Sequence, residues 1–116
     1  MQFQLPPQYL EFIETTKVVE CFTSDEPGYI QFWRVDELDK INADVETELN
    51  APDYFGFGSN GGGEMIAFDK AGAVFKLPFI GMETQYAIRI ADSFDELVQR
   101  LEPRLQNESS FITQKY

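Results

Sequence analysis

The sequence predicts an α+β fold: a single domain over residues 1–116, in which an N-terminal and a C-terminal helix flank an antiparallel sheet of mixed strand order. Three observations lead to this prediction. With 116 residues, 43% of them hydrophobic and 15% aromatic, the chain can bury one sizeable core. Apolar residues recur at helical spacing near both ends, and short β-rich runs separated by turn residues lie between them. Helices segregated to the ends of a run of antiparallel strands are typical of α+β proteins.

The first predicted helix covers residues 8–16. Two prolines precede it, and proline suits the first helical position because no N–H is needed there. Its apolar stripe consists of Leu5, Tyr9, Phe12 and Ile13. The helix is therefore expected to be short and amphipathic.

Two strands are predicted next, at residues 17–22 and 29–35. The segment 23–28 between them ends in a Pro-Gly turn signal, so the strands are expected to pair as a hairpin. Strand-forming residues flank both Trp33 and Cys21. We therefore interpret Trp33 as a core anchor and Cys21 as a buried structural thiol.

A second helix is predicted over residues 37–45, with Asp36 as its N-terminal cap. Its buried stripe consists of Leu38, Ile41 and Val45. Residues 46–52 are expected to form a polar connection to the central stretch.

The central stretch, residues 52–69, is the most distinctive part of the sequence. Three consecutive glycines, Gly61 to Gly63, predict a tight turn because glycine accepts positive φ without steric cost. The apolar runs 64–69 and 73–79 flank a short glycine-containing loop and predict a hairpin. A further strand is expected over residues 86–91, with Tyr86, Ile88 and Ile90 on one face.

The last predicted helix begins at Ser93. Glu96 follows three residues later, so the two can form a capping box. The apolar stripe of this helix consists of Phe94, Leu97, Val98 and Leu101, and Pro103 limits its length. The core is expected to span residues 5–102, followed by a polar tail over residues 103–116.

The composition excludes several classes of function. The chain has 9 Lys and Arg against 20 Asp and Glu, a formal net charge of −11, which disfavours nucleic acid and anionic membrane surfaces as partners. The charge serves either solubility or attraction to a basic protein. One cysteine and no histidine exclude an internal disulfide, Cys/His zinc sites and catalysis by a Ser-His or Cys-His pair. No targeting or membrane-length segment is visible, so a cytoplasmic location is expected.

The glycine-rich turn and the acidic residues beside it do not predict catalysis. A P-loop would need a Gly-Lys-Ser/Thr sequence and a following helix, whereas a strand is predicted after Gly63. Glu64 and Asp69 are five residues apart on that strand and so project from opposite faces. A role at the strand ends or in closing a turn is expected for them, not a catalytic pair or a metal site.

Several sequence blocks together resemble the SUKH superfamily, over about residues 5–102. The N-terminal blocks are Leu5-Pro6 with Tyr9, Phe12 and Ile13, then Phe32-Trp33 with Asp36-Glu37-Leu38 and Asn42. Val74-Phe75 with Pro78-Phe79 and the segment 91–97 form the later blocks. The central block is identified as the family's structural signature: Tyr54, Phe57, Gly58, Asn60, Gly61, Gly62, Gly63, Glu64, Phe68 and Asp69. One departure is Glu14 to Lys17, where family members often have an Asn-Gly-Gly turn.

The resemblance implies a mixed α+β fold and a protein-binding role without catalytic residues, cofactor or metal. Bacterial members are commonly immunity proteins that neutralise toxins, many of them nucleases. Fungal members regulate cell-wall synthesis and signalling through protein contacts. Either role is possible for this chain. The candidate partner-binding residues, which could face a basic toxin domain or could simply be a solvated surface, are Glu37, Asp39, Asp44, Glu46, Glu48 and Asp53.

Overall fold

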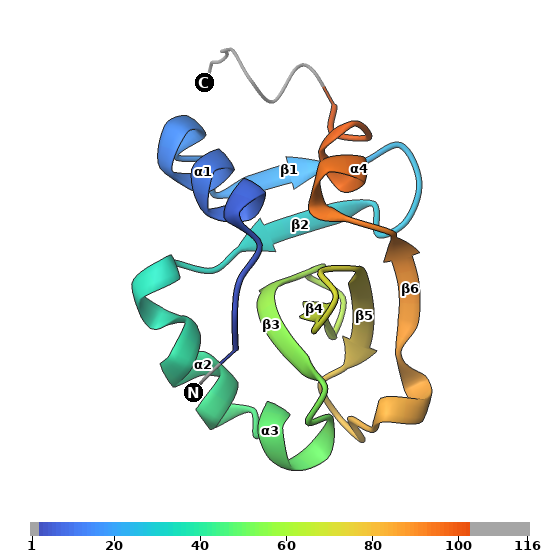
Figure 1. The fold of residues 1–116 in the computed structure, drawn as a ribbon. Coiled ribbons are helices and arrows are strands. Elements are labelled where there is room, and N and C mark those ends of the chain that lie inside the picture. The colour runs from blue at the N-terminus through green and yellow to red at the C-terminus, as the bar shows by residue number, and fades with distance from the viewer. Residues whose placement is uncertain (1–2, 103–116) are drawn as a thin grey trace.

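The computed structural model describes residues 3–102, which fold into a curled six-stranded antiparallel sheet with helices around it (Figure 1). The α+β class is confirmed. The strands follow one another in sequence order across the sheet, so the expected mixed order is wrong. The strands are β1 (Glu20–Phe22), β2 (Tyr29–Phe32), β3 (Tyr54–Ser59), β4 (Glu64–Asp69), β5 (Val74–Pro78) and β6 (Ile88–Ala91). The helices are α1 (Pro7–Thr16), α2 (Leu38–Asp44), α3 (Thr47–Asn50) and α4 (Phe94–Val98), with 3-10 turns η1 (Val35–Glu37) and η2 (Thr84–Tyr86).

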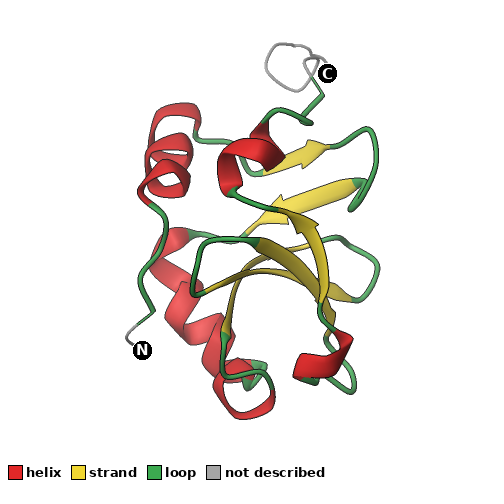
Figure 2. Ribbon diagram, turned by 45° about the vertical axis from the view of Figure 1, so that its right-hand side comes forward, coloured by secondary structure: helices red, strands yellow, loops and turns green. Residues whose placement is uncertain are grey.

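The core has two parts, one on each face of the sheet. Because side chains alternate along a strand, Ile66 and Phe68 of β4 enter the first part and Met65 and Ala67 the second. Helices α1 and α4 lie together beside the first part, and α2 and α3 lie against β3 (Figure 2). Strand β4 is thus buried on both faces, which explains its continuous apolar sequence.

Tyr9 of α1 lies at the centre of an aromatic cluster in the first part of the core. Its ring stacks on Phe57, with centroids 5.3 Å apart, and meets Phe68 and Phe94 edge-on at 5.3 and 5.4 Å. Such pairs add to the free energy gained from burial alone. This cluster joins both terminal helices to the middle of the sheet.

No strand was predicted over residues 54–59, where the structure has the glycine-containing strand β3. A Cβ atom on Gly56 would collide with Met65 and Trp33, and one on Gly58 would collide with the carbonyl oxygen of Gln31. The pairing of β3 with β4 also shifts register between the two glycines. Glycine is therefore needed here for close packing within the sheet, not for a turn.

The first hairpin is shorter than expected. Lys17 adopts a left-handed conformation with φ of 57° and donates its N–H to the carbonyl of Ile13, so it closes helix α1, and β1 begins only at Glu20. Trp33 is partly buried between both parts of the core, and Cys21 is buried, so both expectations for these side chains are confirmed.

The predicted helix 37–45 is divided into η1 and α2, and Asp36 does not cap it. The Asp36 carboxylate instead accepts two hydrogen bonds from the guanidinium of Arg34. The segment 46–52, for which only a polar connection was predicted, contains α3. Glu46 takes a left-handed conformation between the two helices, which lets the chain turn there.

Strand β6 and helix α4 differ from prediction in detail. Tyr86 belongs to η2, and a register shift opposite Val74 and Phe75 makes Ile90 an extra residue on β6. Ile90 is consequently buried while Ile88 is 54% exposed, so the expected common apolar face is wrong. The Ser93 cap is confirmed: its Oγ accepts the N–H of Glu96, whose carboxylate returns to the N–H of Asp92. The tail from residue 103 lies outside the described residues.

Candidate functional site

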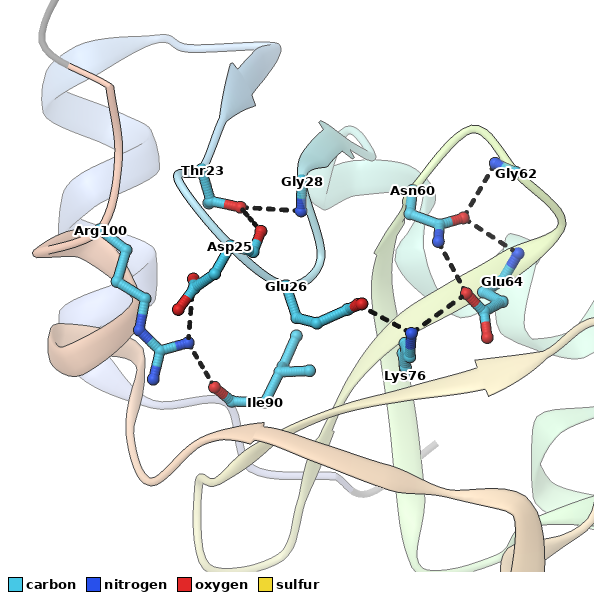
Figure 3. Close-up of polar contacts among 10 residues, drawn as sticks. All are labelled: Thr23, Asp25, Glu26, Gly28, Asn60, Gly62, Glu64, Lys76, Ile90 and Arg100. Atoms are coloured by element: carbon cyan, nitrogen blue, oxygen red, sulfur yellow. Dashed lines mark hydrogen bonds and ion pairs between the residues drawn. The ribbon is translucent and has the colours of Figure 1, made fainter.

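The turn between β3 and β4 is closed by its own polar side chains (Figure 3). Asn60 Oδ1 accepts the N–H groups of Gly62 and Glu64 at 2.9 and 3.1 Å, and Asn60 Nδ2 donates to Glu64 Oε1 at 2.8 Å. At the other end of β4, the Asp69 carboxylate accepts the N–H groups of Ala71 and Ala73. The carboxylates of Glu64 and Asp69 therefore close turns at opposite ends of one strand.

Lys76 connects this turn to the loop between β1 and β2. Its Nζ lies 2.8 Å from Glu26 Oε1 and 3.7 Å from Glu64 Oε1, and its side chain is only 15% exposed. The hydrogen bond to Glu26 is the main reason that the pKa of Lys76 is raised. The ammonium group thus stays charged and holds two carboxylates that would otherwise repel each other.

The loop between β1 and β2 is held by hydrogen bonds within the loop and by Arg100, which follows helix α4. Thr23 Oγ1 donates to the carbonyl of Asp25 and accepts the N–H of Gly28, at 2.7 and 2.8 Å. Arg100 donates to the carbonyl of Ile90 and lies 3.9 Å from the Asp25 carboxylate. These polar residues of Figure 3 bind one another and fix the loop against the end of the sheet.

The remaining titratable groups in the core do not favour catalysis. Burial raises the pKa of the Cys21 thiol to about 12, with the charge of Glu20 adding to the effect. Burial also raises the pKa of Tyr9 to about 12. Both groups are therefore protonated and unreactive at neutral pH. Within residues 3–102, no three His, Cys, Asp or Glu side chains are placed to hold a metal ion.

The six predicted partner-binding carboxylates are all exposed, on the side of the molecule formed by η1, α2, α3 and the start of β3. Two of them have a cationic neighbour: Asp44 lies 2.8 Å from Lys40, and Asp53 lies 3.6 Å from Lys70. Both pairs are solvent-exposed and so contribute little to stability. Over the described range, no salt bridge involves the other four, which are Glu37, Asp39, Glu46 and Glu48.

Three of the six carboxylates surround a surface depression. Asp39, Glu46 and Glu48 line it together with Leu49, Asn42 and Ala43. Leu49 is 74% exposed, so it presents an apolar side chain to solvent beside these carboxylates. Glu37, Asp44 and Asp53 do not line this depression. We call Asp39, Glu46, Glu48 and Leu49 the acidic face.

Leu49 was missed in the sequence, although a signal was present. It is the one aliphatic side chain larger than alanine in the polar segment 46–52. A lone leucine in such a segment either enters the core or remains on the surface. The formation of α3 directs it outward here, beside the carboxylates of Glu46 and Glu48.

Comparison with known proteins supports the relationship indicated by the sequence blocks. A search of curated proteins finds no match to the chain. No helix between residues 3 and 102 combines the length and apolar character needed to cross a membrane. The sequence model of the SMI1 / KNR4 family (SUKH-1) matches residues 1–100, which include every strand and α-helix of the described range 3–102. The chain therefore belongs to the SMI1 / KNR4 family, SUKH-1.

Proposed function

We propose that this chain is a non-enzymatic protein-binding domain that acts in the cytoplasm as an immunity protein, binding and neutralising a bacterial toxin. Membership of the SUKH-1 family supports a role in protein–protein interaction. The net charge of −11 supports a basic partner. The signature carboxylates of Glu64 and Asp69 are engaged in closing turns, which agrees with a structural role for them.

The acidic face carries this proposal. It combines carboxylates that have no salt bridge within residues 3–102 with an exposed aliphatic side chain, Leu49. Opposite charges steer two proteins together, and burial of an apolar side chain then slows their separation. Full burial of a leucine contributes roughly 1.5–3 kcal/mol. A basic surface with a small apolar contact is thus the partner chemistry that this face fits.

A toxin nuclease would offer such a surface. Its substrate groove must attract phosphates, so it is lined by lysine and arginine side chains. The carboxylates of Asp39, Glu46 and Glu48 could occupy the positions of phosphates in that groove. Binding there would block the substrate directly and would weaken as salt increases.

Co-expression tests the proposed function. The chain is expressed with the toxin domain encoded beside it, and both growth and co-purification are measured. We expect restored growth and a stable complex. Toxicity that persists with every neighbouring toxin domain, together with absence of any complex, would reject the immunity role.

Paired variants then test the acidic face separately. D39N/E46Q/E48Q removes its charge, whereas E11Q/E83Q/D95N removes the same charge from exposed positions elsewhere. Growth rescue should be weakened by the first variant and retained by the second. Equal rescue by both would leave the immunity role intact and reject this face as the binding surface.

The alternative is a regulatory or scaffold module in cell-wall or signalling processes. Membership of the family is consistent with it as well. This role predicts a conserved housekeeping gene, not a toxin gene, beside the coding sequence. Capture of the endogenous partner by the tagged full chain separates the two roles, because a toxin and an envelope or signalling protein are distinguished by mass spectrometry.

A further inference from the structure

A groove lies between helix α1, the residues before β1 and the residues after β2. Three of the side chains that line it are apolar and exposed: Leu10 by 40%, Val35 by 39% and Val19 by 65%. Helix α1 packs Tyr9 and Phe12 on the core, whereas the three exposed side chains belong to neither part of the core. Exposed apolar side chains gathered in one place mark a contact surface.

The charges around this groove are balanced, unlike those of the whole chain with its net charge of −11. The charged residues of its lining are Glu14, Lys17, Arg34 and Asp36. Arg34 and Asp36 form a salt bridge with each other at 2.8 Å. Glu14 and Lys17 form no salt bridge with any residue of the range 3–102, and Lys17 is the one lysine or arginine of that range for which this holds. Two copies of so acidic a chain repel each other over most of their surface, but not here.

Lys17 occupies a backbone position that disfavours lysine. Its φ of 57° lies in the left-handed region, where glycine or asparagine usually ends a helix. Residues held in such a conformation cost free energy and are concentrated at functional sites. An ion pair of the Lys17 ammonium group with a binding partner would offset that cost. The nearest carboxylate in sequence, Glu14, does not form this pair within the chain.

A second copy of the chain supplies partners for both charges at once. In a two-fold symmetric pair the same surface of each copy meets the other, so every contact between two different residues occurs twice. We propose that the chain forms a two-fold symmetric dimer through this groove, in which Glu14 of each copy pairs with Lys17 of the other. The exposed side chains of Leu10, Val19 and Val35 form the apolar part of the contact. The groove and the acidic face share no lining residue, so the carboxylates of the acidic face take no part in this pairing.

Charge reversal tests the reciprocal ion pairs. The dimer dissociation constant of the full chain is measured by analytical ultracentrifugation, and circular dichroism checks that each variant is folded. Glu14→Lys sets two cations against each other at each contact and Lys17→Glu sets two carboxylates, so either change alone should weaken dimerisation about tenfold or more. An equal mixture of these two variants restores both ion pairs and should dimerise as the wild type does. Glu11→Lys is the control, because it makes the same change of net charge at an exposed position of α1 outside the groove, and it should not weaken the dimer.

Three results would overturn the proposal. One is a wild-type chain that stays monomeric at every concentration. Another is a dimer that neither single reversal weakens. The third is a mixture of folded Glu14→Lys and Lys17→Glu chains that dimerises no better than either variant alone.

A second pair of variants tests the apolar part of the contact. Val19→Asp and Leu49→Asp each add one negative charge at a largely exposed apolar side chain, 65% exposed in the groove and 74% exposed on the acidic face. Val19→Asp should weaken dimerisation about tenfold or more, because a carboxylate would be buried in the contact. Leu49→Asp should leave the dimer as it is. Equal dissociation constants for the two variants would overturn the proposal, and so would a monomeric chain that loses its toxin complex on Val19→Asp, since this would assign the groove to the toxin.

Discussion

Replacing Asn42 with alanine should destabilise this domain much more than replacing an exposed polar side chain with alanine. The Asn42 side chain is 1% exposed and connects α2 to β3. Its Nδ2 donates to the carbonyls of Gly56 and Leu38, both at 2.9 Å, and its Oδ1 accepts the N–H of Gly56 at 2.8 Å. The amide thus bonds both backbone groups of Gly56, as a neighbouring strand would.

The expected loss of stability follows from the backbone groups of Gly56 that Asn42→Ala would leave without a hydrogen-bond partner. Strand β2 pairs with β3 only at Gly58 and Ser59, so it does not reach Gly56. Without the Asn42 amide, one N–H and one C=O of Gly56 would be buried without a partner. Each such group costs about 1–3 kcal/mol, which gives a loss of about 2–6 kcal/mol in the free energy of unfolding. This is a large part of the 5–15 kcal/mol that is typical of a domain.

Urea denaturation followed by circular dichroism measures this loss. Asn50→Ala is the matched control, because Asn50 is exposed and its amide donates only to the carbonyl of Glu46 at 3.1 Å. The control should change stability by no more than about 0.5 kcal/mol. A loss below about 1 kcal/mol for Asn42→Ala would refute the view that this side chain replaces a strand.

Three further predictions concern the core and its charges. Tyr9→Phe should leave stability unchanged or raise it by up to about 2 kcal/mol, measured by thermal unfolding, because the Tyr9 hydroxyl is buried without a hydrogen-bond partner in the described structure. Cys21→Ala should make stability decline less steeply above pH 9. In the folded chain the pKa of the Cys21 thiol is raised to about 12, so the thiol of the unfolded chain loses its proton at a lower pH. The stability that this difference contributes is fully present below pH 9 and is lost as the pH rises toward 12. Urea titrations from pH 8 to 11 check this, and an unchanged slope contradicts it. Lys76→Met should cost roughly 1–2 kcal/mol in urea denaturation, because Glu26 and Glu64 lose their common cation, and the loss should shrink in high salt.

Local sequence signals predicted those elements whose determinants are local. Helix α4 is an example, since Ser93 and Glu96 lie within one turn and form the cap that their spacing indicates. The burial of Cys21 within an apolar run is another. In both cases neighbouring residues in the chain determine the structure.

The features that were missed depend on contacts between distant residues. Gly56 and Gly58 resemble loop residues until Met65, Trp33 and the carbonyl of Gln31 are placed beside them. Asp36 has the chemistry of a helix cap, but the guanidinium of Arg34 competes for its carboxylate. Neither outcome is visible in local spacing.

The candidate site was likewise predictable only in part. Exposure of its carboxylates follows from their positions in polar segments. Their grouping around Leu49 depends on the left-handed turn at Glu46, which changes the chain direction between α2 and α3. Nothing in the sequence around Glu46 marks this turn, since glycine or asparagine is the usual residue there.

The association rate of the chain with the toxin domain that it is proposed to bind, measured against salt concentration, tests the central claim most directly. We predict a steep fall in rate as salt increases, because the carboxylates of the acidic face, which have no salt bridge within residues 3–102, steer the encounter. D39N/E46Q/E48Q should flatten this dependence and slow association about tenfold or more at low salt, whereas E11Q/E83Q/D95N should retain the steep dependence. A rate that is insensitive to salt, or equal slopes for the two variants, would contradict recognition through the acidic face.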